Sequence, residues 1–198
     1  MSDPFHDGSR ALQDRFDTRE LADYCYAKLV RDRMNPKQQA FIESADMFFL
    51  ATVDDKAQPT CSYKGGDPGF VRVIDEQTLA IPNYDGDGKY LSWGNTLNNP
   101  NLAILFINFE KGWRLRVHGI ASIDHADPLL AYCPGAQFIV RIKIREIFGN
   151  CPRYIHKYQL VERNSYVPRC DRPTPVPDWK KQPDWNAVLP KNDPAKNV

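Results

Sequence analysis

The sequence predicts a mainly β protein, an antiparallel barrel or sandwich with flanking helices. From position 47 onward, the chain divides into short runs rich in β-branched and aromatic residues. Most of these runs are separated by a few polar residues, which favours hairpins over long crossover connections. One late run, 138–148, alternates charged and aliphatic side chains with the period of two typical of a half-buried strand. A chain of 198 residues is long enough for one such domain with appendages.

The N-terminal part predicts two helices. Apolar side chains recur at helical spacing over 18–33, with Thr18 placed as an N-cap and arginines in the last turn. Pro36 then suits the first turn of a second helix that continues to Ile42. We interpret residues 1–45 as a helical cover for the β domain.

Six or seven strands are expected in the central part of the chain, residues 46–167, from seven candidate segments. In chain order they are 47–53, 59–64, 70–75, 78–83, 102–109, 113–123 and 138–148. Two short helices, over 90–98 and 127–132, are expected to connect strands at the ends of the barrel.

The last part of the chain predicts an extended arm. Seven of the 31 residues in 168–198 are proline, which makes a compact core there unfavourable. Because this segment also holds Trp179 and Trp185, we expect it to dock onto a surface instead of remaining solvated.

Composition excludes several classes of function. The formal net charge of +1 provides no basic surface for nucleic acid, and no apolar run is long enough for a membrane helix. The N-terminus lacks the apolar region of a secretory signal. Five scattered cysteines, an odd number, match neither a disulfide framework nor a zinc site. We therefore expect a cytoplasmic protein with reduced thiols, no metal, and no membrane or nucleic-acid partner.

A candidate anion site lies between positions 64 and 100. Arg72 falls on one predicted strand, and Lys89 follows the next strand after the loop Asp85-Gly86-Asp87-Gly88. The backbone amides of a helix start together with an ammonium form an anion site, and arginine and lysine bind phosphate strongly. Convergence of the two cations on a phosphorylated, flat cofactor is one interpretation. The other is that both are ordinary surface cations. The spacing of GDGK is not that of a P-loop.

A second candidate segment follows the last strand. Asn150, Cys151 and Arg153 surround Pro152, which is placed to open a helix running through Tyr158. A helix start lowers the pKa of a thiol, so Cys151 is either a reactive thiolate or part of a structural helix cap. We find no nucleophile paired with a base and no histidines at metal-ligand spacing, so no catalytic residue is assigned.

Four stretches resemble one known family in order and spacing. They are FFLATVDDKAQPTCSYKGGDPGFVRV (48–73), TLAIPNYDGDGKYLSWGNTLNNPNLAILF (78–106), LRVHGIASI (115–123) and FGNCPRYIHKYQLVERNSYVP (148–168). Together they cover well over half the chain. They are similar to the pyridoxamine 5′-phosphate oxidase superfamily, in the branch whose members are not true pyridoxamine phosphate oxidases. The resemblance implies an antiparallel, Greek-key-like split β-barrel that binds FMN.

The resemblance also implies which residues contact the cofactor. They are Phe70, Val71, Arg72, Val73, Pro82, Asn83, Gly88, Lys89 and Arg114. For Asn150, Cys151 and Arg153 two interpretations stay open: contact with the polar edge of the flavin, or a structural helix cap. Arg72 matches the basic residue that faces the phosphate. Relatives carry two adjacent basic residues in the following loop, whereas this chain has Gly88 in place of the first and keeps only Lys89. Arg114 matches a position that reaches the flavin ring from the other subunit.

The function that the resemblance implies is that of an FMN-binding oxidoreductase. Such a homodimer would transfer two electrons between its flavin and a small-molecule substrate that the sequence does not name. The family's C-terminal substrate residues have no counterpart in the proline-rich arm, so pyridoxamine phosphate oxidase activity is not expected. Three alternatives remain: a non-catalytic flavin or haem carrier, a relative that uses a deazaflavin, and a purely structural barrel.

Overall fold

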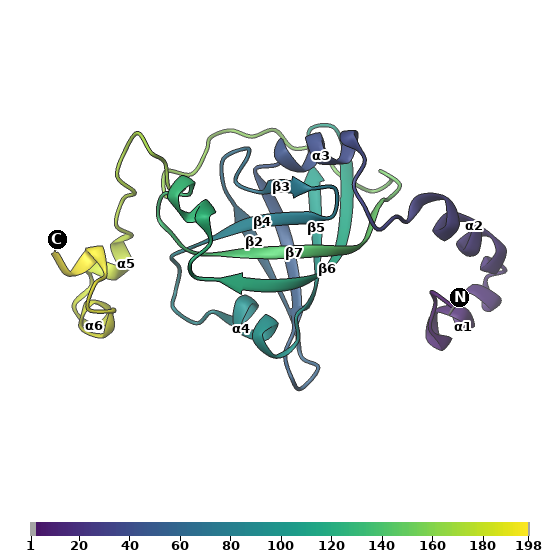
Figure 1. Ribbon diagram of the computed structural model, residues 1–198, viewed down its shortest axis with the longest axis horizontal. Helices are drawn as coiled ribbons and strands as arrows, with labels where there is room; N and C mark the ends of the chain where they lie inside the picture. The colour runs from purple at the N-terminus through teal and green to yellow at the C-terminus, as the bar shows by residue number, and fades with distance from the viewer. Residues whose placement is uncertain (1–2, 198) are drawn as a thin grey trace.

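The computed structural model describes residues 3–197, which form a seven-stranded antiparallel sheet with flanking helices (Figure 1). The strand order is β2-β1-β5-β6-β7-β4-β3, and the sheet curls into a barrel whose edge strands, β2 and β3, are not paired with each other. The strands are β1 (Met47–Val53), β2 (Pro59–Gly65), β3 (Arg72–Asp75), β4 (Thr78–Tyr84), β5 (Asn101–Asn108), β6 (Trp113–Asp124) and β7 (Ala136–Gly149). The predicted fold class is confirmed, and each of the seven candidate segments contains a strand.

The interior of the barrel is apolar because each strand turns alternate side chains inward. Phe48 and Phe106 are fully buried with ring centroids 5.5 Å apart, and Phe70 stacks on Phe48 at 5.7 Å. A bulge in the pairing of β6 with β7 falls at Gly119, where a Cβ would lie 2.8 Å from the Lys143 carbonyl oxygen. Only glycine fits this close approach, and such bulges let a sheet curl.

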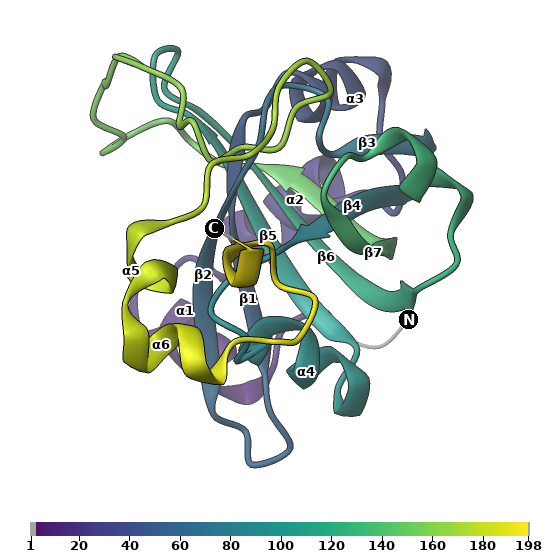
Figure 2. The ribbon, with the colours of Figure 1, turned by 90° about the vertical axis from the view of Figure 1, so that its left-hand side faces the viewer.

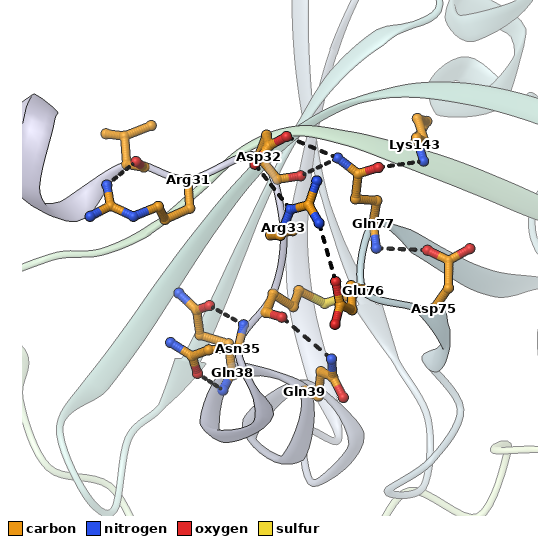
Figure 3. Close-up of polar contacts among 12 residues, drawn as sticks. Arg31, Asp32, Arg33, Asn35, Gln38, Gln39, Asp75, Glu76, Gln77 and Lys143 are labelled. Carbon is orange, nitrogen blue, oxygen red and sulfur yellow. Dashed lines mark hydrogen bonds and ion pairs between the residues drawn. The ribbon is translucent and has the colours of Figure 1, made fainter.

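Helix α3 (Pro36–Glu43) covers one part of the barrel, and Figure 3 shows how it is fastened. Asn35 and Gln38 form a reciprocal capping box at its start. Just before it, the Met34 N–H donates to the Glu76 carbonyl at 2.7 Å. Gln77 donates to Asp32 and accepts from Lys143, so the β3–β4 turn is tied to the chain entering α3 and to β7.

Two further helices lie outside the barrel at the N-terminus (Figure 1). Helix α1 (Asp7–Arg15) was not predicted, and α2 (Arg19–Leu29) ends before the predicted limit at residue 33. Neither helix has a buried residue, which explains why α1 lacks the apolar periodicity that sequence reasoning needs. The Tyr26 hydroxyl, which donates to Glu146 at 2.7 Å, joins α2 to the barrel.

The expected connections at the barrel ends are present as α4 (Leu91–Asn98) and a 3-10 turn, η1 (Pro128–Tyr132). The helix predicted to run from Pro152 to Tyr158 is wrong. Tyr154 has a φ of 69°, a left-handed conformation that interrupts a helix. The chain instead forms a turn, and the Tyr158 N–H donates to the carbonyl of Phe109, the residue that follows β5.

The C-terminal arm ends in three short helical segments that were not predicted. They are α5 (Asp178–Lys181), α6 (Pro183–Val188) and the 3-10 turn η2 (Pro194–Asn197). The two tryptophans of the arm contact each other edge to face, with centroids 5.6 Å apart. Within residues 3–197, no helix combines the length and apolar character needed to cross a membrane.

Candidate functional site

A hollow of about 230 Å³ lies between edge strand β2 and the chain that leaves β4, and we call it the lysine hollow. It is lined by Ser62, Lys64, Asn83, Tyr84, Gly86, Asp87, Gly88, Lys89, Tyr90, Leu91, Ser92 and Trp93. Two of these residues are lysines contributed by different elements. Residues 85–90, which connect β4 to α4, form most of one wall, and we refer to them as the β4–α4 loop.

Strand pairing explains why Lys64 points into the hollow. In the β1–β2 hairpin Lys64 lies opposite Phe48, and Ser62 lies opposite Leu50. Both partners are core residues, so Ser62 and Lys64 are on the inner face of β2. Inner positions of a barrel are normally apolar. A lysine at such a position, beside the open seam of the barrel, is therefore an exception that needs a reason.

The Lys64 ammonium is half-buried and lacks a counter-ion. Its Nζ lies 5.6 Å from the centre of the Trp93 ring, and no ion-pair partner for it is present within residues 3–197. Burial lowers the pKa of Lys64, and the charge of Asp87 opposes that shift. The hydroxyls of Ser62 and Ser92 lie 3.0 Å apart on the same wall. The hollow thus offers an unpaired cation and two hydroxyls to an anion.

Lys89 approaches the hollow from the β4–α4 loop. Its ammonium lies 2.8 Å from the Asp87 carboxylate, and both side chains are well exposed. The φ of Gly88 is +75°, so glycine suits this position, where a Cβ would meet no neighbour. An anion in the hollow would compete with Asp87 for the Lys89 ammonium.

Lys89 lines the lysine hollow, whereas Arg72 does not. Arg72 pairs with Ala80, so its side chain is on the opposite face of the sheet from that of Asn83, three residues further along β4. There it donates from Nη2 to the Tyr132 carbonyl at 3.3 Å, while its Nε is buried without a partner.

The other residues near Arg72 that were predicted to contact the cofactor have side chains that pack or hydrogen-bond within this chain. Asn83 is buried; its Oδ1 accepts from Trp93 at 2.8 Å and its Nδ2 donates to Gln137 at 2.8 Å. Phe70 and Val71 belong to the core, Val73 packs against that core, and Pro82 is buried in β4. Side chains committed to the core leave only their backbone for a ligand.

The remaining predicted residues form a second cluster where β6 begins and β7 ends. Arg114 donates from Nη2 to the Cys151 carbonyl at 3.0 Å, and Arg153 Nε lies 3.2 Å from the Cys151 sulfur. The Arg114 Nε and the Asn150 Oδ1 are buried without partners. Buried polar atoms are normally satisfied, so each of these two atoms has capacity for a further hydrogen-bond partner.

The two clusters lie at opposite ends of one strand. Phe138 of β7 pairs with Asn83, and Gly149, at the other end, pairs with Leu115. That stretch of β7 measures about 35 Å along the chain at the rise of a β-strand. Figure 1 shows β7 crossing the width of the barrel. One subunit therefore does not bring Lys89 and Arg114 to the same small ligand.

A larger groove of about 720 Å³ lies beside the lysine hollow, and Tyr84 lines both. Strand alternation divides β2 between them, because Tyr63 lines the groove while Ser62 and Lys64 line the hollow. Burial raises the pKa of Tyr84 to about 12, so its hydroxyl stays protonated at neutral pH.

We expect Arg153→Leu to slow alkylation of Cys151 by iodoacetamide at pH 7. The backbone N–H and the guanidinium of Arg153 hold the pKa of this thiol below its usual value. Losing the guanidinium raises the pKa and leaves less thiolate to react. Peptide mass spectrometry of FMN-free protein measures the rate. Lys157→Leu is the control, and equal rates in both variants would contradict the assignment.

The comparison with known families decides the family. The family model described as pyridoxamine 5′-phosphate oxidase matches residues 34–164, about two thirds of the chain. The chain belongs to the pyridoxamine 5′-phosphate oxidase family. The resemblance seen in the sequence is thereby confirmed. The match includes the whole sheet, the lysine hollow and the second cluster, and it ends before the C-terminal arm. No curated protein matches the chain.

Several solved structures are similar to the chain. A putative pyridoxamine 5′-phosphate oxidase from Lactobacillus delbrueckii is 21% identical, with 60% of this chain and 95% of that one covered and a TM-score of 0.49. HupZ from Group A Streptococcus is 19% identical, with 64% and 99% covered and a TM-score of 0.48. A protein from Syntrophomonas wolfei described as FMN-binding is 13% identical, with 73% and 96% covered and a TM-score of 0.43.

Sequence reasoning missed Lys64. Its signal was present, because the strand that holds it pairs in a hairpin with MFFLATV, whose Phe48 and Leu50 point inward. Assigning the hairpin register would have placed Lys64 opposite Phe48. The hairpin register could not have predicted the residues that α4 contributes. Ser92 and Trp93 reach the hollow only because α4 packs against the barrel.

Proposed function

We propose that this member of the pyridoxamine 5′-phosphate oxidase family is an FMN-binding oxidoreductase that holds the FMN phosphate in the lysine hollow. The observation that carries the proposal is the half-buried ammonium of Lys64, which faces the hollow without a counter-ion. Partial burial disfavours the charged form of an unpaired lysine. A phosphate supplies the missing charge and accepts charge-assisted hydrogen bonds from Lys64 and Lys89.

Lys64 also compensates for the basic residue that Gly88 replaces, which is a second argument for the proposal. The loop of this chain has a single basic residue where relatives are expected to have two. Lys64 enters the same hollow from β2 and provides the second positive charge. Ser62 and Ser92 add hydroxyls that donate to phosphate oxygens. The residues present therefore fit a monoester phosphate.

We further propose a homodimer in which the flavin ring extends from the lysine hollow toward the second cluster of the other subunit. The hollow is smaller than the 300–1,000 Å³ or so of typical cofactor pockets, so it accommodates the phosphate end only. Arg114 and Asn150 have unsatisfied buried atoms but lie at the far end of their own barrel. In the proposed dimer, a two-fold axis would bring one subunit's second cluster beside the other's lysine hollow.

The bound flavin would supply two-electron transfer with a small-molecule substrate, and the protein would supply position and charge. Lys64 and Lys89 would anchor the phosphate. Arg114 would donate to a polar atom at the edge of the ring, and a guanidinium there stabilises negative charge. Tyr84, which stays protonated at neutral pH, is placed between the hollow and the larger groove as a hydrogen-bond donor to a ligand.

The proposal is tested by the cofactor that co-purifies with the protein. We expect recombinant protein to show flavin absorption bands, and mass spectrometry of the extract to identify FMN. Stopped-flow bleaching of those bands by candidate electron donors then tests the oxidoreductase activity. Protein that neither carries nor takes up FMN contradicts the proposed cofactor, and bound FMN that no donor reduces favours a carrier.

A further inference from the structure

The C-terminal arm ends in a small folded unit built around one lysine. We call residues 178–197 the C-terminal cap; it contains α5, α6 and η2. The Lys180 side chain is only 5% exposed, and its ammonium lies 2.7 Å from Asp193, which is also 5% exposed. Asn186 donates to the Lys180 and Ala195 carbonyls, which closes the cap around the lysine.

The second carboxylate that pairs with Lys180 comes from the barrel. Its ammonium lies 2.5 Å from Asp85, the first residue of the β4–α4 loop. Within residues 3–197, this is the only ion pair that joins the C-terminal cap to the barrel. Figure 2 looks onto this end of the molecule, with α5 and α6 in front of the barrel. Lys180 is buried in this pair, whereas the Asp85 side chain is 57% exposed, so the contact ties the loop to the cap at moderate strength.

The β4–α4 loop, which Lys180 contacts through Asp85, is rich in glycine and therefore costly to order. The β4–α4 loop contains Gly86 and Gly88, and glycine loses more conformational freedom on ordering than any other residue. Lys89 lies four residues beyond Asp85 in the same loop and lines the lysine hollow. Fixing a loop before its ligand arrives reduces the entropy cost of binding.

We propose that Lys180 is a positioning residue that clamps the β4–α4 loop and so holds Lys89 in place for the phosphate. The proposal rests on the function proposed above and adds a role for the arm, which lies outside the matched family region. Lys180 does not touch the ligand. It acts through Asp85 and the backbone of the loop.

The test uses full-length protein and two neighbouring lysines. Lys180→Met is expected to weaken FMN binding about tenfold and to speed amide hydrogen exchange over 85–90 in FMN-free protein. Lys181→Met is the matched control, because Lys181 is half-exposed and pairs only with Asp178 of its own helix. Lys180→Arg, which keeps the charge, is expected to restore much of the affinity.

A double-mutant cycle separates the clamp from a general loss of stability. Asp85→Asn alone is expected to weaken FMN binding about as much as Lys180→Met, and the double variant no further than either single one. Additive losses, or exchange over 85–90 equal to that of the Lys181→Met control, would overturn the clamp. Wild-type protein that fails to bind FMN would overturn the proposed function instead, while the exchange data still decide whether the clamp exists.

Discussion

Replacing both lysines of the hollow is expected to abolish FMN binding at micromolar protein. Lys64→Met removes a half-buried ammonium with no other partner, and we expect an affinity loss of about tenfold. Lys64→Met combined with Lys89→Met leaves the phosphate with hydroxyls only, and the expected loss exceeds about 100-fold. Quenching of flavin fluorescence during titration measures both values.

Lys56→Met is the matched control for these variants. Lys56 lies exposed in the turn between β1 and β2, on the same hairpin as Lys64 but away from the hollow. Its loss should leave FMN affinity unchanged. Because Lys64 has no ion pair to lose, the thermal midpoint of Lys64→Met without FMN should not fall below that of the control. If Lys64→Met binds FMN as tightly as Lys56→Met, the phosphate is not in the lysine hollow.

Mixing two defective variants is expected to restore flavin sites. One carries Lys64→Met and Lys89→Met, and the other carries Arg114→Leu. Each homodimer then has two damaged sites. A mixed dimer has one site with both defects and one site with none, provided that each site takes its lysines and its arginine from different subunits. Random exchange makes half the dimers mixed, so about a quarter of the wild-type number of high-affinity sites should return.

The mixture is measured by counting high-affinity FMN sites after denaturation and refolding of the two variants together. Each variant refolded alone is the control and should give none. A monomeric protein, or a dimer whose sites lie within one subunit, gives no recovery in the mixture. Sedimentation distinguishes these two outcomes, and either would contradict the shared site.

The strands were predictable from the sequence because their signals are local. MFFLATV and PTCSYK carry β-branched residues around a polar turn, and FIVRIKIREIF alternates with a period of two. The capped helix that starts at Pro36 was readable for the same reason. The turn at Tyr154 was not readable, because a left-handed tyrosine in the structure replaces the helix that Pro152 suggested. The cap helices were hidden by the seven prolines of the arm, two of which begin helical segments.

The site was only partly predictable, and the reason is the register of the sheet. Sequence spacing placed Arg72 and Lys89 close together along the chain. The face of β3 that Arg72 occupies follows from its pairing with Ala80, and spacing along the chain does not give that pairing. Lys64 was not predicted as a site residue, because its inward orientation follows from its pairing with the core residue Phe48 on β1. Lys180 reaches Asp85 across 95 residues of sequence, a contact that no local pattern encodes.

The affinity ratio of FMN to riboflavin for the wild-type protein tests the central claim most directly. The two ligands share the ring and the ribityl chain and differ only in the phosphate. If Lys64 and Lys89 bind that phosphate, calorimetric titration should give FMN an affinity at least about 100-fold higher, and the advantage should shrink in Lys64→Met. Equal affinity for FMN and riboflavin would contradict the account, because the unpaired ammonium would then face something other than a flavin phosphate.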